Sequence, residues 1–165
     1  MKYELGNFPA FIYDERQLEH SIVRVKSIAL ESGCKLLYSP KACGVPGILI
    51  SLENHVDGFS CSSLYEAHLV REVVGRGSAI HLTTPGISEH HINEFIEVCD
   101  TVVLNSLTQW IRFRDKFKGQ VDLGLRINPQ ISFAEDPRYD PCRTNSKLGV
   151  PLDKLADQFE KSPQT

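Results

Sequence analysis

The sequence has no long apolar run, no paired cysteine motif and no excess of one charge. Its five cysteines are odd in number and include no C-x-x-C pair, so neither a disulfide framework nor a zinc site is indicated, and a reducing compartment is expected. No stretch of roughly 18 apolar residues is present, and the N-terminus lacks the apolar core of a signal peptide. We therefore expect a cytoplasmic protein without a membrane segment.

The charge balance argues against two further classes of partner. Lysine and arginine number 18 against 21 aspartates and glutamates, which gives a net charge of -3, and no run of like charges occurs. Nucleic-acid and membrane-surface proteins carry basic patches, so a small-molecule partner is the better expectation. With 41% hydrophobic residues, the 165-residue chain can bury the core of one domain.

A short apolar run followed by a stretch of helical periodicity repeats along the chain. Short β-branched runs begin 20 to 23 residues apart, about the length of a strand, a helix and two loops. They lie at 35–39, 55–60, 78–83, 101–106 and 121–128, and each precedes a stretch with helical periodicity. Strands that alternate with helices form a parallel sheet with helical crossovers, so the pattern predicts an α/β fold.

The expected helices carry start signals and apolar faces. Ser63 with Glu66, and Ser106 with Gln109, have the spacing of a capping box. Helical spacing predicts that one face of each helix is buried. The residues expected on such faces are Leu18, Ile22, Val25 and Ala29 near the N-terminus and Leu152, Leu155, Ala156 and Phe159 near the C-terminus.

Polar side chains follow every expected strand. Because the carboxyl ends of parallel strands meet at one edge, where ligands bind in both open sheets and barrels, these side chains should lie together. They are Lys41, Ser60 to Ser63, Thr83 and Thr84, Asn105 and Ser106, and Arg126 with Asn128.

The stretch LLYSPKACGVPG, residues 36–47, places Lys41 where an apolar run ends. Partial burial beside apolar neighbours would disfavour the charged form of its amine, and such a lysine can form a Schiff base with a carbonyl compound. A strand-end lysine can equally be a plain solvated residue. Spacing alone does not separate these two interpretations.

Several stretches together resemble a known family. LLYSPKA is similar to the strand-plus-lysine signature of the fold-type III pyridoxal-phosphate enzymes, the group of alanine racemase and the ornithine and diaminopimelate decarboxylases. VDGFSCSSLYEA, VVLNSLTQW, LGLRINP and SKLG look closest to the carboxynorspermidine/carboxyspermidine decarboxylases. The resemblance runs in order from about residue 8 to residue 159, nearly the whole chain.

The resemblance implies pyridoxal 5'-phosphate (PLP) as cofactor, held covalently by Lys41, and no metal. The serine and glutamate of the family's D-x-A-S-x-x-E element correspond to Ser63 and Glu66 in S-C-S-S-L-Y-E. Ser60 stands where most relatives have aspartate, a departure shared by the carboxynorspermidine branch. These residues are expected to bind the cofactor, with Lys41 as the catalytic amine.

Two further residues join the implied cofactor site. Arg126, in LRINP, matches the arginine that helps to orient the cofactor, and Asn105 is expected near the ring. Each candidate has a purely structural alternative: Ser63 and Glu66 as a capping box, and Arg126 as a buried ion-pair residue. The remaining polar residues are better explained as lining, turn or solvated positions: His81, Thr83, Thr84, His90 and His91.

The segment 130–147 has no periodicity and contains two prolines. A loop of this length in a compact domain is usually functional or disordered. In the resembling family it lies over the mouth of the active site. Cys142 within it is expected to be an ordinary loop thiol.

The implied activity is decarboxylation of carboxynorspermidine or carboxyspermidine in norspermidine or spermidine biosynthesis, by a homodimer. The substrate amine would replace Lys41, and the pyridinium ring would accept the electrons left by loss of carbon dioxide. The two substrates differ by one methylene, worth about 1–3 kcal/mol in a pocket. The sequence does not choose between them.

The fold expected for residues 1–165 is a partial TIM-type (β/α)8 barrel, since eight strands and about 250 residues make a closed one. The barrel's second half and the relatives' β domain, which carry the phosphate cradle, a ring-nitrogen carboxylate and a catalytic cysteine, would be absent. We expect an N-terminal fragment that is inactive alone and binds PLP weakly. The alternatives are a non-enzymatic PLP-binding protein of this fold and a remnant that pairs with a partner subunit.

Overall fold

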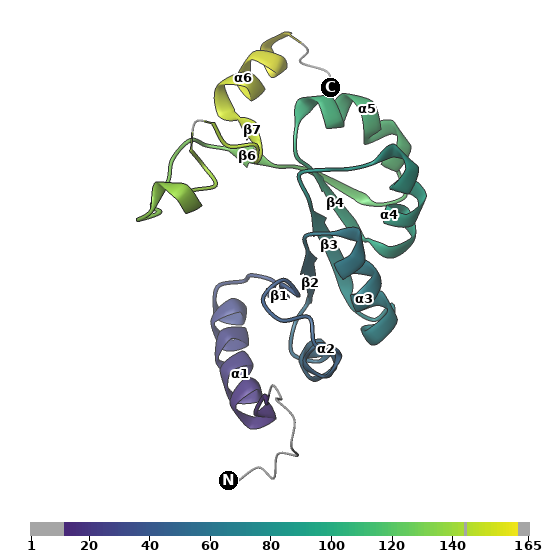
Figure 1. The fold of residues 1–165 in the computed structure, drawn as a ribbon, viewed down its shortest axis with the longest axis vertical. Coiled ribbons are helices and arrows are strands. Elements are labelled where there is room, and N and C mark those ends of the chain that lie inside the picture. The colour runs from purple at the N-terminus through teal and green to yellow at the C-terminus, as the bar shows by residue number, and fades with distance from the viewer. Residues whose placement is uncertain (1–11, 144, 162–165) are drawn as a thin grey trace.

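The computed structural model describes residues 12–143 and 145–161, the last three by their backbone only. A five-stranded parallel sheet is its centre, with the strands in sequential order and no crossover between non-neighbours (Figure 1). The predicted α/β fold with five parallel strands is confirmed. The strands are β1 (Leu37–Tyr38), β2 (Gly58–Cys61), β3 (Ala79–Thr83), β4 (Thr101–Leu104) and β5 (Asp122–Leu125).

Helices connect these strands and pack side by side as one layer. Each packs on the next along the chain, and the layer covers one face of the sheet (Figure 1). Sequential strand order with helices on a single face is the winding of a β/α barrel, whereas doubly wound sheets carry helices on both faces. The connecting helices are α2 (Pro46–Glu53), α3 (Leu64–Val74), α4 (Ile92–Val98) and α5 (Leu107–Phe117).

The core lies between the helix layer and one face of the sheet. Alternate strand residues are fully buried because side chains of a strand alternate between faces. They meet apolar helix residues in a single cluster. Its most buried members include Phe59, Ile80, Leu82, Val102 and Leu104 on strands and Leu49, Val70 and Phe117 on helices.

The run 121–128 was expected to be one strand, and this prediction is wrong. The chain leaves the large sheet at Arg126, whose N–H still donates to the Leu104 carbonyl at 2.8 Å. The Arg126 carbonyl instead accepts from Val150 at 2.8 Å. A second, two-stranded parallel sheet of β6 (Ile127–Asn128) and β7 (Val150–Pro151) follows.

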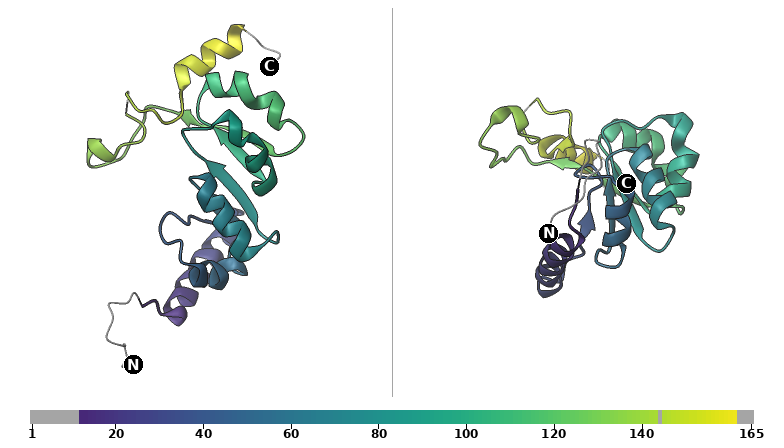
Figure 2. Two further views of the ribbon diagram at one scale, coloured as in Figure 1. Left: turned by 45° about the vertical axis from the view of Figure 1, so that its right-hand side comes forward. Right: turned by 60° about the horizontal axis from the view of Figure 1, so that its bottom comes forward.

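The first and last helices bury less than their periodicity predicts. In α1 (Glu15–Glu31) Val25 is 45% exposed, and in α6 (Leu152–Lys161) Leu152 is 52% exposed and Ala156 is also exposed. The expected burial of Val25, Leu152 and Ala156 is therefore wrong. The Phe159 side chain lies outside the described residues. The reason is position: α1 and α6 lie at opposite ends of the molecule and have neighbours on one side only (Figure 2).

An arginine fastens the amino ends of the strands. All five N–H groups of Arg71 are used: Nε and Nη2 donate to the Val98 carbonyl (3.2 and 2.7 Å), Nη1 to the Gly75 and Ser78 carbonyls (3.0 and 3.2 Å), and Nη2 also to Asp100 (3.0 Å). Its side chain is 12% exposed. The guanidinium therefore joins the end of α3 to the start of β4.

Aspartates complete this fastening. The Asp100 carboxylate accepts the Ile80 N–H at 2.7 Å, while the Asp100 N–H donates to the Ile80 carbonyl at 2.9 Å. Asp57 holds Leu36 in the same two-way manner, at 2.7 and 2.8 Å. These bonds satisfy backbone groups that a strand end would otherwise leave open.

Replacing Arg71 by alanine should lower the free energy of unfolding by about 3 kcal/mol, because partly buried carbonyl groups lose their donors. Arg76, an exposed arginine five positions along the chain, is the matched control, and Arg76→Ala should change stability by less than about 0.5 kcal/mol. Urea unfolding measures both. Equal effects of the two substitutions would contradict the fastening role.

Candidate functional site at the carboxyl edge of the sheet

Lys41 lies in a tight turn directly after β1. The turn is closed by the Ala42 N–H, which donates to the Ser39 carbonyl at 3.0 Å, and by the Tyr38 hydroxyl, which donates to the Cys43 carbonyl at 3.1 Å. Burial and the neighbouring Cys43 raise the pKa of Tyr38. The Lys41 side chain is exposed, so of the two interpretations of this lysine the structure shows the solvated one and not the partly buried one.

Ser63 and Glu66 fix the loop that follows β2. The Ser63 hydroxyl caps α3 by accepting the Glu66 N–H at 3.2 Å. The Glu66 carboxylate reaches one residue further back than in a standard capping box and accepts both the N–H (2.8 Å) and the hydroxyl (2.9 and 3.0 Å) of Ser62. The capping interpretation of this pair is confirmed, and Ser62 is a partner that sequence reasoning missed.

The loop after β4 repeats this geometry. The Ser106 hydroxyl accepts the Gln109 N–H at 3.1 Å, and the Gln109 side-chain oxygen accepts the Asn105 N–H at 2.7 Å. Ser63 and Ser106 share the same backbone angles, φ -150° and ψ 159°. Because an amide also donates, Gln109 bonds the Pro85 carbonyl at 2.9 Å and ties the β3 and β4 loops together.

Asn105 was expected near a bound ring, and the structure gives its amide another task. The residue is 7% exposed, and its amide donates to the Lys147 carbonyl at 2.8 Å and accepts the Gly149 N–H at 3.0 Å. The side chain thus clasps the SKLG stretch from 42 to 44 positions away. It holds one end of the long loop against the sheet.

Arg126 is half-buried at the end of β5, and its guanidinium forms no salt bridge with a described carboxylate. The alternative of a buried ion pair is therefore not observed. Its stem packs on Gly149, where an added Cβ would lie 3.2 Å from the Arg126 Cγ. Ser60, the remaining candidate, is half-buried on β2 and faces away from the helix layer.

Cys61 ends β2 beside these residues but is not a nucleophile candidate. It is 1% exposed, and burial, followed by the nearby Glu66 carboxylate, raises the pKa of Cys61 to about 12. A thiol is weakly reactive when it stays protonated. All five cysteines are free, and Cys142 is a half-buried loop thiol.

The long loop projects from the second sheet. Beyond Asn128 it contains one short 3-10 turn, Pro137–Tyr139, and it extends away from the five-stranded sheet in both views (Figures 1 and 2). Phe133 within it is 96% exposed.

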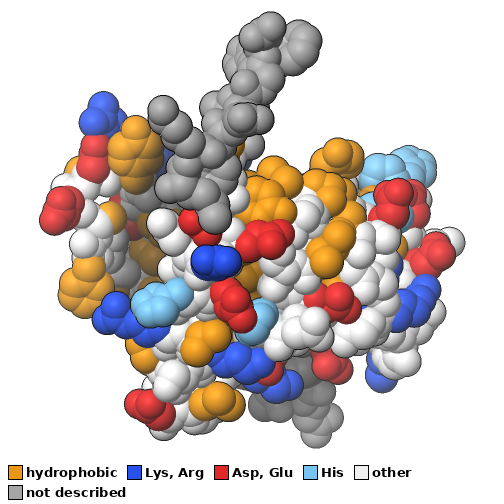
Figure 3. Space-filling model, turned by 90° about the horizontal axis from the view of Figure 1, so that it is seen from below, with side chains coloured by type: hydrophobic (Ala, Val, Ile, Leu, Met, Phe, Trp, Pro, Cys, Tyr) orange, Lys and Arg blue, Asp and Glu red, His pale blue; other side chains and the backbone are white. Residues whose placement is uncertain are grey.

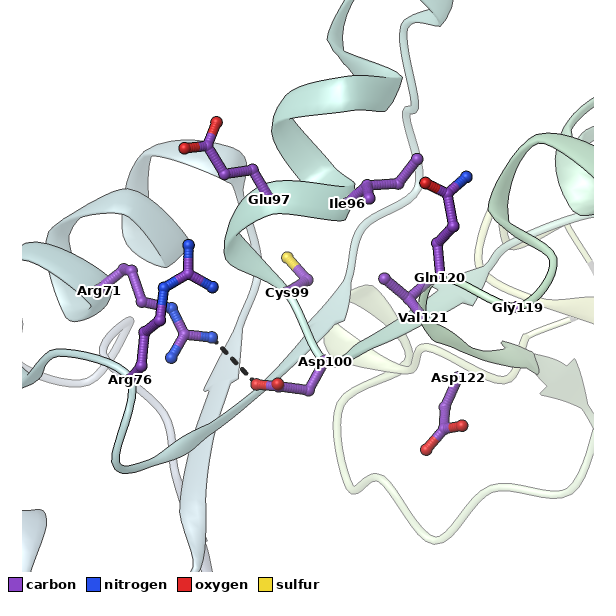
Figure 4. A pocket seen from close by; sticks show the side chains of 10 residues that line it. All are labelled: Arg71, Arg76, Ile96, Glu97, Cys99, Asp100, Gly119, Gln120, Val121 and Asp122. Carbon is purple, nitrogen blue, oxygen red and sulfur yellow. Dashed lines mark hydrogen bonds and ion pairs between the residues drawn. The ribbon is translucent and has the colours of Figure 1, made fainter.

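A concave pocket of about 600 Å³ lies at the opposite, amino end of the strands. Figure 4 shows Arg71, Asp100 and Cys99 among the residues that line it. The donors of Arg71 are all used within the protein, and burial raises the pKa of Cys99 to about 12. Two of the lining residues, Arg71 and Asp100, are therefore already committed to holding the strand ends together.

The side of the molecule drawn in Figure 3 carries no large patch of one charge. On the side drawn in Figure 3, acidic and basic side chains intermingle. No helix among residues 12–143 and 145–161 is long and apolar enough to cross a membrane.

Comparison with known proteins decides the family. The pyridoxal binding domain of pyridoxal-dependent decarboxylases matches residues 17–164. The chain belongs to this family. The match contains every residue of the carboxyl edge described above, from Lys41 to Gly149.

Curated relatives within pyridoxal-dependent decarboxylases agree with this assignment. The carboxynorspermidine/carboxyspermidine decarboxylase of Campylobacter jejuni is 32% identical over 150 residues, which cover 91% of this chain and 38% of the relative. The carboxyaminopropylagmatine decarboxylase of Synechocystis is 30% identical over 149 residues, 90% of this chain and 38% of the relative. The chain thus spans about two fifths of the length of these relatives.

Solved structures support the same fold. Carboxynorspermidine decarboxylase from Campylobacter jejuni, complexed with norspermidine, superposes with a TM-score of 0.78 at 29% identity, over 90% of this chain and 37% of that one. Diaminopimelate decarboxylase from Helicobacter pylori, complexed with L-lysine, gives a TM-score of 0.75 at 20% identity, over 92% and 40%. The second likeness concerns the fold alone.

The residues of the carboxyl edge fit one end of the pyridoxal group. An exposed primary amine, which Lys41 supplies, is what an aldehyde requires. Fewer groups are available to bind the phosphate of the cofactor. The first turns of α3 and α5 are already capped by Ser63 and Ser106, and no described strand end carries a glycine-rich turn. The described chain thus accounts for the aldehyde end of the cofactor.

Asn105→Asp should release the end of the long loop, because a carboxylate cannot donate to the Lys147 carbonyl. We expect trypsin to cleave after Arg143 and Lys147 about tenfold faster than in the wild-type chain. Asn145→Asp, an exposed position in the same loop, is the control and should leave the rate unchanged. Equal rates for Asn105→Asp and the wild-type chain would show that the clasp does not hold the loop.

Gly149→Ala should cost about 3 kcal/mol of unfolding free energy, for two reasons. Gly149 has φ +83°, and an added Cβ would lie 2.9 Å from the Asn128 nitrogen. Gly119 has φ +73° with open space around it, so Gly119→Ala reports the cost of positive φ alone, about 1 kcal/mol. Thermal or urea unfolding measures the difference, and equal costs would mean that the close approach at Gly149 is unimportant.

Proposed function

We propose that this chain is the lysine-bearing part of a PLP-dependent decarboxylase that acts on carboxynorspermidine or carboxyspermidine in polyamine biosynthesis. The observation that carries the proposal is the position of Lys41: an accessible amine at the carboxyl edge of a parallel sheet, in a chain that belongs to the pyridoxal-binding domain family. In β/α barrels the carboxyl edge is where catalytic residues lie.

In the proposed site Lys41 would hold the cofactor covalently through its amine. When bound, the pyridinium ring accepts the electron pair that departing carbon dioxide leaves behind. The turn closed by Ser39 and Ala42 fixes where the amine emerges, and the Tyr38 hydroxyl braces that turn from the buried side. The Lys41 amine would also be the group that returns a proton to the product.

Most of the other site residues implied by the resemblance would act by holding the loops around Lys41 in place. Ser62, Ser63 and Glu66 form a closed hydrogen-bonded set, so their contribution is a rigid loop beside Lys41. Asn105 contributes in the same way at β4. Of the residues implied by resemblance, Ser60 and Arg126 have side chains without a hydrogen bond to a described residue, and they are available to contact a ligand.

The substrate class is an α-amino acid that carries a polyamine chain. The two curated relatives named above are named for carboxynorspermidine/carboxyspermidine and for carboxyaminopropylagmatine. The second candidate, decarboxylation of carboxyaminopropylagmatine, is supported by a similar identity of 30% against 32%. The 165 residues alone should not turn over substrate, because no described turn cradles the phosphate.

The test of the proposal is carbon dioxide release from carboxynorspermidine, carboxyspermidine and carboxyaminopropylagmatine, with PLP present. The protein assayed is the natural-length polypeptide, that is, the polypeptide as the cell makes it. Turnover of at least one is expected, and Lys41→Ala should reduce kcat/KM by about 1,000-fold or more, since the covalent anchor is lost. Lys35→Ala, at an exposed lysine just before β1, should leave it unchanged. Full activity in Lys41→Ala, or no release from any substrate, would contradict the proposed function.

A further inference from the structure

One row of polar side chains crosses the face of the sheet that the helices leave open. Parallel pairing places Ser60 level with His81, His81 with Thr101, and Thr101 with Asp122. Their chain neighbours Phe59, Ile80 and Val102 are fully buried on the helix side, so the four polar residues face the other way. We name these four residues the polar row.

The polarity is concentrated in this row. The row towards the amino ends holds Gly58 and Ala79, and the row towards the carboxyl ends holds Thr83, Val103 and Gly124. Of these rows, only the polar row has a polar side chain on each of its four strands. It includes an imidazole, a group suited to contact with a polar ligand.

The polar row runs to the turn that carries Lys41. Because Tyr38 pairs with Phe59, the next residue, Ser39, is level with Ser60, and Ser39 opens the Lys41 turn. His81 lies two strands from β1, about 10 Å at the usual strand spacing. A lysine stem with a pyridine ring attached has a length on the order of 10 Å.

His81 is the group in this row best suited to an anionic ligand. Ser60 and Thr101 are neutral hydroxyls, and Asp122 at the far strand would repel an anion. Arg126 follows β5, four strands from β1. The imidazole is half-buried, its ring nitrogens form no hydrogen bond or salt bridge with a described residue, and a ring N–H can donate to an anionic oxygen.

We infer that the His81 imidazole donates a hydrogen bond to the phenolate oxygen of a pyridoxal group held at Lys41, and thereby fixes the orientation of the ring. This inference rests on the function proposed above and adds a cofactor contact to it. The phenolate oxygen neighbours the aldehyde carbon, so a group that Lys41 anchors presents it next to the anchor.

PLP titration of the natural-length polypeptide, followed by absorbance, tests the contact. His81→Leu should weaken PLP binding about tenfold, the loss of one hydrogen bond to a charged group, and should shift the ratio of the long- and short-wavelength cofactor bands. His81→Gln, which still donates, should bind within about threefold of the wild type. His90→Leu, the same change at an exposed histidine in the 3-10 helix before α4, is the matched control and should change neither property.

Two outcomes separate this inference from the proposed function. If borohydride fixes PLP on Lys41 of the wild type but His81→Leu keeps the wild-type affinity and band ratio, the His81 contact is refuted and the proposed function stands. If no label reaches Lys41 at saturating PLP, both fail together.

A second measurement needs no substituted protein and applies if His81→Leu does not fold. The ring resonances of His81 should shift on addition of PLP, whereas those of His90, an exposed histidine in the 3-10 helix Glu89–His91, should not. Unmoved His81 resonances at saturating PLP would overturn the inference.

Discussion

The parallel register of β1 to β5 is the constraint on which the proposed site depends. Five strands that run the same way, in sequential order, send every carboxyl end to one edge. The amino ends are locked by Arg71, Asp57 and Asp100, whose polar atoms are committed to backbone groups. The amino ends are thus held by side chains that take no part in the proposed site, and Lys41 lies at the opposite end of the strands.

The two helix starts at the carboxyl edge give this edge its rigidity. Ser63 with Glu66, and Ser106 with Gln109, hold the preceding residue by the same geometry. The difference between glutamate and glutamine has a consequence: the amide of Gln109 also donates to the β3 loop, which a carboxylate could not do. The loops that surround the proposed site are thus fixed before any ligand arrives.

Most of the fold could be predicted from the sequence because it is local. The five strands and the capped starts of α3 and α5 follow from periodicity and from serine spacing within a few residues. The exposure of Lys41, the departure of the chain at Arg126 and the clasp of Asn105 on Gly149 could not, because each depends on contacts between distant segments. In the sequence, Gly149 after SKL is the visible signal of this contact. Its partner, Asn105, lies 44 positions away, so local pattern could not identify the pair.

The central claim is that the carboxyl edge, and not the pocket at the amino ends, receives the pyridoxal group. Borohydride reduction in the presence of PLP, followed by peptide mapping of the natural-length polypeptide, tests it most directly. The account predicts a stoichiometric label on Lys41 and none on Lys118, the lysine next to Gly119 in the amino-end pocket. A label on Lys118, or an even distribution over exposed lysines, would contradict it.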